Sequence, residues 1–370
     1  MTMTSEVAIL LTGVLAASAC SLLGSFLILR RMAMMTDAIS HAILPGLVAG
    51  YFLANGPNLL IGSFGAAVAA VVTVTLVEAL QRTRRVDGGS AIGIVFPAMF
   101  ALGTVLVSRF FADVHLDTDA ILYGNIEFVN FDRLFIGDRD LGPQSLWVMG
   151  GLGVINVTFL ALFYKELKLT TFDPGLAAAI GISPILIHYG LMATLSITAV
   201  GAFTAVGAIL VVALVIVPAA TAYLLTDRLV IMIGLSAVLG AVAAVAGYYG
   251  AVALDASVAG SIVTMTGVLF GAAYLLSPSS GVIAKARRAR HNQQRFAGEM
   301  LVVHLFNHEG TPQQAAESAA GHLVTALNWS SQRATQAVSY ATRRGLVVQS
   351  ADRLALTDAG RVAGRQLVDR

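Results

Sequence analysis

Long apolar stretches, each of about 20 residues, follow one another along this chain as far as residue 276. A helix of about 20 residues rises far enough to cross the hydrocarbon core of a bilayer, which is about 30 Å thick. The stretches lie at residues 6–29, 37–54, 58–80, 90–110, 143–163, 184–202, 206–225, 229–249 and 257–276. We therefore expect an all-α polytopic membrane protein with about eight or nine transmembrane helices. Gly201, Gly207 and Pro218 leave open whether residues 184–225 form full spans or short, re-entrant pieces.

Composition excludes a soluble protein over this length. Apolar residues make up 57% of the chain and charged residues 12%, whereas soluble domains are about 45–50% apolar and about 25% charged. Of the 23 Lys and Arg residues, 11 fall before residue 277 and 12 after it, so a basic tail follows the apolar body. The single Cys20 cannot form a disulfide framework within the chain or a thiolate metal cluster. The first stretch has no basic leader and exceeds a signal-peptide core, which predicts a retained helix.

Basic residues mark one side of the predicted bundle. They are Arg30, Arg31, Arg82, Arg84, Arg85, Lys165, Lys168, Arg228 and the cluster at 285–295. Alternating spans bring all of them to the same side, which the positive-inside rule assigns to the cytoplasm. The opposite side receives residues 109–140, where seven carboxylates (Asp113, Asp117, Asp119, Glu127, Asp132, Asp138 and Asp140) face three arginines. This segment either attracts cations or is a solvated outer loop with a short helix near 119–128.

Asp37 and His41 stand four residues apart at the start of the second stretch and therefore share one helical face. Ionisable groups at membrane depth are costly, so we regard the pair as a candidate metal site. Pro45 has no N–H to donate to the carbonyl of His41, and that oxygen is free for another partner. A second, twofold-related copy would complete four ligands and two negative charges. Imidazole and carboxylate together suit manganese, iron or zinc better than magnesium or calcium.

A structural interpretation of the same pair is open: Asp37 caps the helix, and His41 is satisfied by a backbone carbonyl. His188 with Tyr189, Glu78 and Asp255 lie near span ends, and ordinary interfacial anchoring explains them.

Residues 164–184 form an unusually apolar connection on the predicted cytoplasmic side. Asp173 is a typical N-cap, Pro174 a typical first helical residue and Gly181 a typical terminator, which predicts a helix of about seven residues. Such a helix is too short to span and either awaits a partner surface or lies against the bilayer interface. The sequence contains no G-x-x-x-x-G-K-[ST] phosphate loop, so we expect no ATP hydrolysis by this chain itself.

In combination, several segments resemble the permease family of bacterial manganese, zinc and iron ABC importers. They are LRRMAMMTDAISHAILPG at 29–46, AIGIVFPAMFALG at 91–103, KLTTFDPGLAAAIGIS at 168–183, AVGAILVVALVIVPAATAYLLTDR at 205–228 and LLSPSSG at 275–281. The resemblance covers about residues 7–281 and is specific only in this combination.

The resemblance implies a pore between two permease copies in the bacterial cytoplasmic membrane, identical or paralogous. It also implies two cytoplasmic ATPase subunits, an extracytoplasmic metal-binding protein, no permanently bound cofactor, and a divalent metal as transported substrate, with manganese favoured. Asp37 and His41 match the acidic and histidine positions of the family's metal pathway. The ATPase-coupling helix corresponds to Phe172, Asp173, Pro174, Gly175, Leu176, Ala177, Ala178, Ala179, Ile180, Gly181 and Ile182.

The tail reads as a soluble domain. We expect a permease domain at 1–281, a basic linker at 282–295 and a cytoplasmic domain at 296–370, with helices near 296–308, 312–327 and 330–344. The strand, turn and strand that follow predict a small winged helix-turn-helix (α+β) domain. RRGLVVQSADRLALTDAGR at 343–361 is similar to the DNA-binding domain of the iron-dependent repressor family, without that family's dimerisation and metal-sensing region.

Two functions for the tail stay open, DNA contact or regulation through packing against partner subunits, and nucleic acid is the weaker candidate. Ser330 would cap the third helix, while Arg333, Arg343 and Arg344 are available for phosphates. The tail also contains three histidines, His304, His308 and His322, which are suggestive only by their number. The first two have the spacing of metal ligands on a helix, but the sequence places no carboxylate or thiolate beside them.

For the whole chain, two alternatives accompany the importer permease. The first is an ion-coupled secondary carrier or channel, although we detect no inverted repeats. The second is a membrane-tethered regulator that uses the winged-helix tail, although a tether needs far fewer spans.

Overall fold

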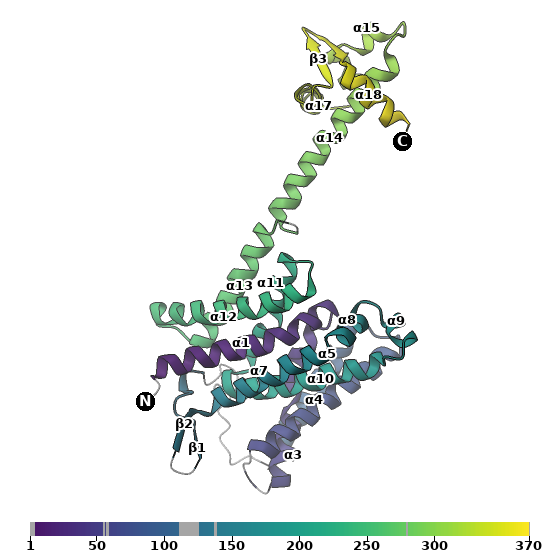
Figure 1. Ribbon diagram of the computed structural model, residues 1–370. Helices are drawn as coiled ribbons and strands as arrows, with labels where there is room; N and C mark the ends of the chain where they lie inside the picture. The colour runs from purple at the N-terminus through teal and green to yellow at the C-terminus, as the bar shows by residue number, and fades with distance from the viewer. Residues whose placement is uncertain are drawn as a thin grey trace. The chain divides into compact units, whose positions relative to one another are not determined.

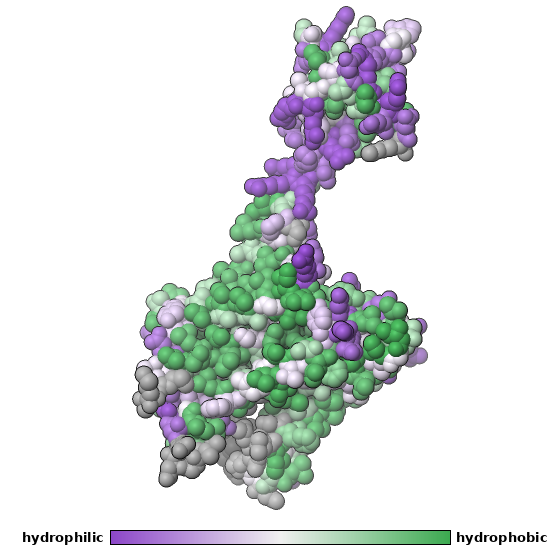
Figure 2. Space-filling view, viewed as in Figure 1, coloured by the Kyte–Doolittle hydropathy of each residue, from purple (hydrophilic) through white to green (hydrophobic). Residues whose placement is uncertain are grey.

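The computed structural model describes residues 4–54, 56, 59–110, 126–136, 139–278 and 280–369, and these fall into two compact units. The membrane unit is Met1–Ser277 and the tail unit is Pro278–Arg370. Figure 2 shows a mostly hydrophobic visible face on the membrane unit and a mostly hydrophilic one on the tail unit. This contrast agrees with the uneven distribution of charge along the sequence.

The membrane unit is a bundle of helices (Figure 1). Its helices are α1 (Ser5–Leu29), α2 (Met34–Ala42), α3 (Leu44–Ala54), α4 (Leu59–Arg82), α5 (Gly88–Phe110), α7 (Gln144–Leu162), α8 (Tyr164–Phe172), α9 (Pro174–Ala179), α10 (Pro184–Val206), α11 (Ala208–Leu225), α12 (Leu229–Leu254) and α13 (Val258–Leu276). In the described part of the chain, nine helical segments are long and apolar enough to cross a membrane, with α2 and α3 counted together. A polytopic helical membrane protein is thereby confirmed.

Two spans differ in detail from the prediction. The span expected at 37–54 begins at Met34 and is interrupted at Ile43, which separates α2 from α3. The doubtful stretch 184–225 consists of two long helices joined at Gly207, whose φ of 86° lies in the region that favours glycine. Gly201 and Pro218, the other suspected breaks, lie within α10 and α11. Neighbouring helices can compensate for a proline in a membrane helix.

The centre of the bundle lies around α1, which packs against α7, α10, α11 and α12. Small residues allow this approach: a Cβ atom added to Gly24 would lie 1.8 Å from the carbonyl oxygen of Val215. Buried polar side chains also connect the helices. Asn156 donates to the carbonyl oxygen of Ala19 at 2.9 Å and accepts from the Thr198 hydroxyl at 3.0 Å. Close backbone packing and interhelical hydrogen bonds therefore hold the bundle together.

The segment between α5 and α7 contains a 3₁₀ turn at Ile126–Phe128 and an antiparallel pair, β1 (Arg133–Ile136) and β2 (Arg139–Pro143). Glu127 accepts a hydrogen bond of 2.8 Å from the backbone N–H of Val258 at the start of α13. A carboxylate is favourable there because the N-terminus of a helix carries a partial positive charge. Asp140 forms a 2.7 Å ion pair with Arg133. These two carboxylates therefore have structural partners. Asp113, Asp117, Asp119 and Asp138, and most of the helix expected near 119–128, lie outside the described residues.

The tail unit has its own apolar core, formed by α14 and the elements that follow it. The elements are α14 (Val282–His308), α15 (Gln314–Glu317), a 3₁₀ turn at Ala320–His322, α16 (Leu323–Ala326), α17 (Ser331–Arg343), β3 (Val347–Ser350), β4 (Arg353–Leu356) and α18 (Asp358–Val368). The stretch 282–295, expected as a basic linker, is part of the continuous helix α14.

The helix expected over 312–327 is wrong as a single element. Three short turns replace it, because the backbone at 318–320 pairs with the ribbon instead of continuing a helix. The N–H of Leu354 donates to the carbonyl of Ser318, and the N–H of Ala320 donates to the carbonyl of Asp352, both at 2.8 Å. Strands β3 and β4 form an antiparallel ribbon in the register Val347↔Leu356 to Ser350↔Arg353.

Candidate functional site

Helix α2 carries the predicted metal pair on one face. The Nε2 atom of His41 lies 3.6 Å from the Oδ1 atom of Asp37, one helical turn earlier. The His41 side chain is 32% exposed and the Asp37 side chain 38% exposed in the single chain. At about 1.5 Å per residue, His41 lies about 10 Å along the helix from Met34. The structure thus brings the two predicted ligands together and leaves their outer face open.

Aromatic and small residues of α5 form the other side of this pair. The His41 ring lies 5.2 Å from the ring centre of Phe96 and 6.0 Å from that of Phe100. Gly103, one turn further along α5, faces the junction of α2 and α3, and a Cβ added there would lie 2.9 Å from the Cδ of Pro45. Pro45 stands in the first turn of α3, where its missing N–H costs no intrahelical bond. Helix α5 can therefore approach the interruption closely.

One carboxylate and one imidazole are too few ligands to hold an ion by themselves, because four-coordinate sites need at least three protein ligands and often a water. Both groups are nevertheless accessible, and they are of the type that divalent transition metals accept. In the described part of the chain, no other carboxylate or imidazole forms an ion pair with Asp37 or His41. Water, the ion's own hydration shell or another chain could supply further ligands.

Helix α9 is built as the sequence predicted. The Asp173 carboxylate accepts a 2.9 Å hydrogen bond from the Leu176 N–H, and Pro174 is the first helical residue. At the other end, the Gly181 N–H donates to Ala178 and the Ile182 N–H donates to Ala177. Together with the φ of 89° at Gly181, this pattern is a Schellman motif. Both ends of this short helix are thus fixed by their own sequence.

An apolar stripe runs along the outer face of this segment. Ala177 is fully buried, whereas Phe172, Leu176 and Ile180 are exposed. Phe172 ends α8, Leu176 lies within α9 and Ile180 follows its last residue, and the non-helical backbone of Asp173 separates α8 from α9. An exposed apolar stripe of this kind is typical of a surface that binds another protein or a membrane.

Arg30 connects the loop before α2 to the helix before α9. Its Nε and Nη2 atoms donate to the hydroxyls of Thr171 at 3.0 Å and Thr170 at 2.9 Å, both on α8. Its Nη1 atom lies 3.3 Å from Nδ1 of His188 on α10. Partial burial lowers the pKa of Arg30 from its ordinary value, yet a guanidinium stays charged at pH 7. We call this set of contacts the Arg30 strut.

The Arg30 strut was missed in the sequence, where His188 and Glu78 were explained as separate interfacial anchors. In the structure the His188 imidazole contacts the Glu78 carboxylate of α4, and Glu78 also forms an ion pair with Arg82 at 3.5 Å. Their proximity depends on how α4 and α10 pack, and sequence spacing carries no information on that. The sequence signal for this contact was that an acidic and a basic residue lie near the ends of two spans on the same predicted side of the membrane.

The three tail arginines do not form one cluster. Arg333 lies near the start of α17 over the Trp329 ring at 5.3 Å, whereas Arg344 follows its end over the Tyr340 ring at 5.6 Å. Arg343, the last residue of α17, is exposed. The predicted cap is confirmed, because Ser330 accepts a hydrogen bond from the Arg333 N–H at 3.3 Å. Two of the three side chains therefore already have aromatic partners.

Comparison with known proteins gives consistent matches over most of the chain. Residues 4–277 match the ABC 3 transport family. The zinc transport system membrane protein TroD of Treponema pallidum is 45% identical over 358 residues, which cover 97% of each chain. The manganese transport system membrane protein MntD of Bacillus subtilis is 43% identical over 296 residues, or 80% of this chain and all of that protein.

A solved structure agrees with these sequence matches. PsaBC from Streptococcus pneumoniae, determined in complex with Fab, superposes with a TM-score of 0.61 at 31% sequence identity. The superposition covers 74% of this chain and 92% of the solved one.

Proposed function

The chain belongs to the ABC 3 transport family, and on that basis we propose that it is the permease subunit of an ATP-driven importer of divalent transition-metal ions. The family match over residues 4–277 is the observation that carries this function. The chain is a multi-pass protein of the cell membrane and is not itself an enzyme. ATP hydrolysis belongs to separate subunits of the transporter, in agreement with the absence of a phosphate loop from the sequence.

We infer that Asp37 and His41 line the metal pathway where two permease copies meet, either identical or paralogous. An ionisable side chain exposed to lipid near the centre of a membrane helix costs about 2.5–3.5 kcal/mol or more. Both side chains are partly exposed in the single chain, so a partner surface relieves this cost. Two copies would supply two imidazoles and two carboxylates, which complete a four-ligand site and balance a divalent ion.

The ligand set favours ions of the first transition series over magnesium and calcium, which prefer oxygen ligands alone. The names of the similar proteins include both zinc and manganese. We propose manganese as the first choice and zinc or iron as the other outcomes of a direct test. In this proposal the metal is cargo, and no cofactor is bound permanently.

We propose that the apolar stripe of Phe172, Leu176 and Ile180 docks on one of two cytoplasmic ATPase subunits. The capped ends of α9 give the stripe a defined shape, and the Arg30 strut connects it to the loop that begins α2. Movement of the ATPases can therefore reach the helix that carries Asp37 and His41. On the opposite side of the membrane, an extracytoplasmic metal-binding protein would deliver the ion.

For the tail we propose a winged-helix domain in the cytoplasm that regulates the transporter through contacts with partner subunits. Helix α17, the ribbon of β3 and β4, and the pairing of Ala319 with Arg353 support this architecture. The aromatic partners of Arg333 and Arg344 favour a packing role over phosphate contacts. Binding of duplex DNA to the purified chain, with a steep dependence on salt, would instead indicate a nucleic-acid function.

The transport proposal is tested by reconstituting the chain with its ATPase and metal-binding protein in proteoliposomes. We expect accumulation of radioactive manganese only when ATP is supplied on the ATPase side. Accumulation without ATP that follows an imposed ion gradient would contradict the proposal and indicate a secondary carrier.

A further inference from the structure

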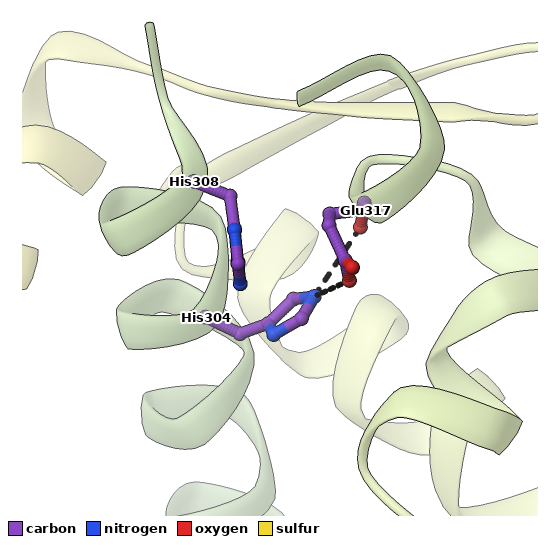
Figure 3. A group of neighbouring side chains, drawn as sticks. All are labelled: His304, His308 and Glu317. Carbon is purple, nitrogen blue, oxygen red and sulfur yellow. Dashed lines mark hydrogen bonds and ion pairs between the residues drawn. The ribbon is translucent and has the colours of Figure 1, made fainter. Parts of the chain in front are cut away.

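Three metal-ligating side chains outside the proposed pathway meet in the tail unit. His304 and His308 extend from successive turns of α14, and Glu317 reaches toward them from the end of α15 (Figure 3). The candidate ligand atoms of the three residues all lie within 4.8 Å of one another. We propose that His304, His308 and Glu317 form a binding site for a divalent transition-metal ion, with His322 or water completing the coordination.

The geometry fits a four-coordinate ion. Two ligand atoms that each lie about 2.1 Å from a tetrahedral ion are separated by about 3.4 Å. The Nε2 atom of His304 and the Oε2 atom of Glu317 are 3.2 Å apart, and the Nε2 atom of His322 lies 3.2 Å from the same oxygen. The rings of His304 and His308 have centres 4.9 Å apart, so a small side-chain rotation brings the second imidazole into range.

Helix α14 provides two ligands at the spacing that metal sites on helices use. Residues four apart share a helical face, and two imidazoles placed this way bind zinc in other helical sites. One turn of a rigid helix therefore fixes the relative positions of His304 and His308, while Glu317 comes from a separate element. Such an arrangement needs little reorganisation on binding.

Glu317 itself is an unusual group for a protein interior. Its Oε2 atom is buried and receives no hydrogen bond within the part of the chain that the structure describes, although two imidazole nitrogens lie 3.2 Å away. A buried polar atom without a hydrogen bond requires an explanation, and an ion at the site is one. A divalent ion held by this oxygen would accept its lone pair and neutralise its charge.

A plain His–Glu ion pair is the competing explanation, and it needs a protonated imidazole. A neutral imidazole can instead donate from Nε2 to the backbone carbonyl oxygen of Glu317, which lies 3.3 Å away. The neutral form is also the one that ligates a metal. Two imidazoles and a carboxylate suit zinc and its neighbours in the transition series better than magnesium or calcium.

The site uses none of the residues proposed for transport, so it can be tested separately. The full chain is purified in detergent with Asp37→Asn and His41→Gln, which removes the proposed pathway ligands. Cobalt(II) is then added as a zinc-like probe with a visible spectrum, and bound metal is measured by equilibrium dialysis. We expect a tightly bound equivalent of cobalt with the intense absorption of a four-coordinate site.

Two further variants in this background locate the ion. His308→Gln and Glu317→Gln each remove one ligand with little change in size, and we expect each to weaken cobalt binding by about tenfold or more. His291→Gln, an exposed histidine on the same helix, is the matched control and should bind as the parent does. Far-ultraviolet circular dichroism checks that every variant keeps its helices.

Two results would overturn the proposal. One is a parent chain that binds no cobalt in the visible-spectrum assay. The other is equal binding by the parent, the His308→Gln variant and the Glu317→Gln variant, which would place the ion elsewhere.

Discussion

Replacing Arg30 with glutamine should loosen the connection between the metal-bearing helix and the proposed coupling segment. The guanidinium forms hydrogen bonds to Thr170 and Thr171 on α8 and contacts His188 on α10. Glutamine is shorter and uncharged, so it cannot make all of these contacts. Arg31 provides a matched control, because Arg31→Gln removes the same charge from the same loop at an exposed position.

The expected magnitude follows from the contacts that are lost. A hydrogen bond from a charged group contributes about 1.5–3 kcal/mol. The Thr170 and Thr171 hydroxyls also donate to the carbonyls of Glu166 at 2.8 Å and Leu167 at 2.6 Å, so neither is left without a partner. Arg30 is only partly buried, which reduces the effect further. We therefore expect Arg30→Gln to lower the free energy that holds this loop against α8 by about 2 kcal/mol. That loss is equivalent to about a 30-fold increase in the population of the state in which the loop and α8 are separated.

Hydrogen–deuterium exchange of the reconstituted chain measures this directly. Backbone amides of α8 and α9 should exchange about 30-fold faster in Arg30→Gln than in wild type, while Arg31→Gln should match wild type. In the full transporter, Arg30→Gln should also transport less metal per ATP hydrolysed. Unchanged exchange and unchanged coupling in Arg30→Gln would refute the strut.

Three further predictions concern packing and docking. Asn156→Leu removes the hydrogen bond donated to Ala19 and the one accepted from Thr198, although Thr198 keeps its hydrogen bond to Thr194. We therefore expect the free energy of unfolding, measured by denaturation in micelles, to fall by only about 1 kcal/mol. Gly24→Val places a side chain against the backbone of Val215 and should prevent a monodisperse bundle on size-exclusion chromatography. Gly150→Ala should not, because its added Cβ meets no atom of the described residues within 4 Å. Leu176→Asp puts a charge into the exposed apolar stripe and should abolish co-purification of the ATPase subunit; full retention of that subunit would place its docking site elsewhere.

The spans were predictable because the bilayer imposes a strong local requirement on sequence. Each spanning helix must satisfy its own backbone and present apolar side chains, and both demands are visible in a window of about 20 residues. The caps of α9 were equally local, since Asp173, Pro174 and Gly181 act within one or two turns. The Asp37 and His41 pair was predictable for the same reason, because helical spacing alone places both on one face.

Contacts between distant segments were not predictable from one sequence. The contact of His188 with Glu78 joins residues on two spans, and its existence depends on helix packing. Glu317 likewise reaches the His304 and His308 pair from another element, so the sequence showed two histidines without a carboxylate. The helix expected over 312–327 failed because backbone pairing with the ribbon overrides local helix propensity at 318–320.

Metal uptake by Asp37→Asn and His41→Gln variants tests the central claim most directly. Each variant should assemble with the ATPase subunits and hydrolyse ATP, yet fail to accumulate radioactive manganese, zinc or iron in proteoliposomes. Ser40→Ala on the same helix serves as the control and should transport normally, because its hydroxyl donates to the carbonyl oxygen of Thr36 on its own helix. Wild-type rates of uptake in both Asp37→Asn and His41→Gln would contradict the proposed pathway.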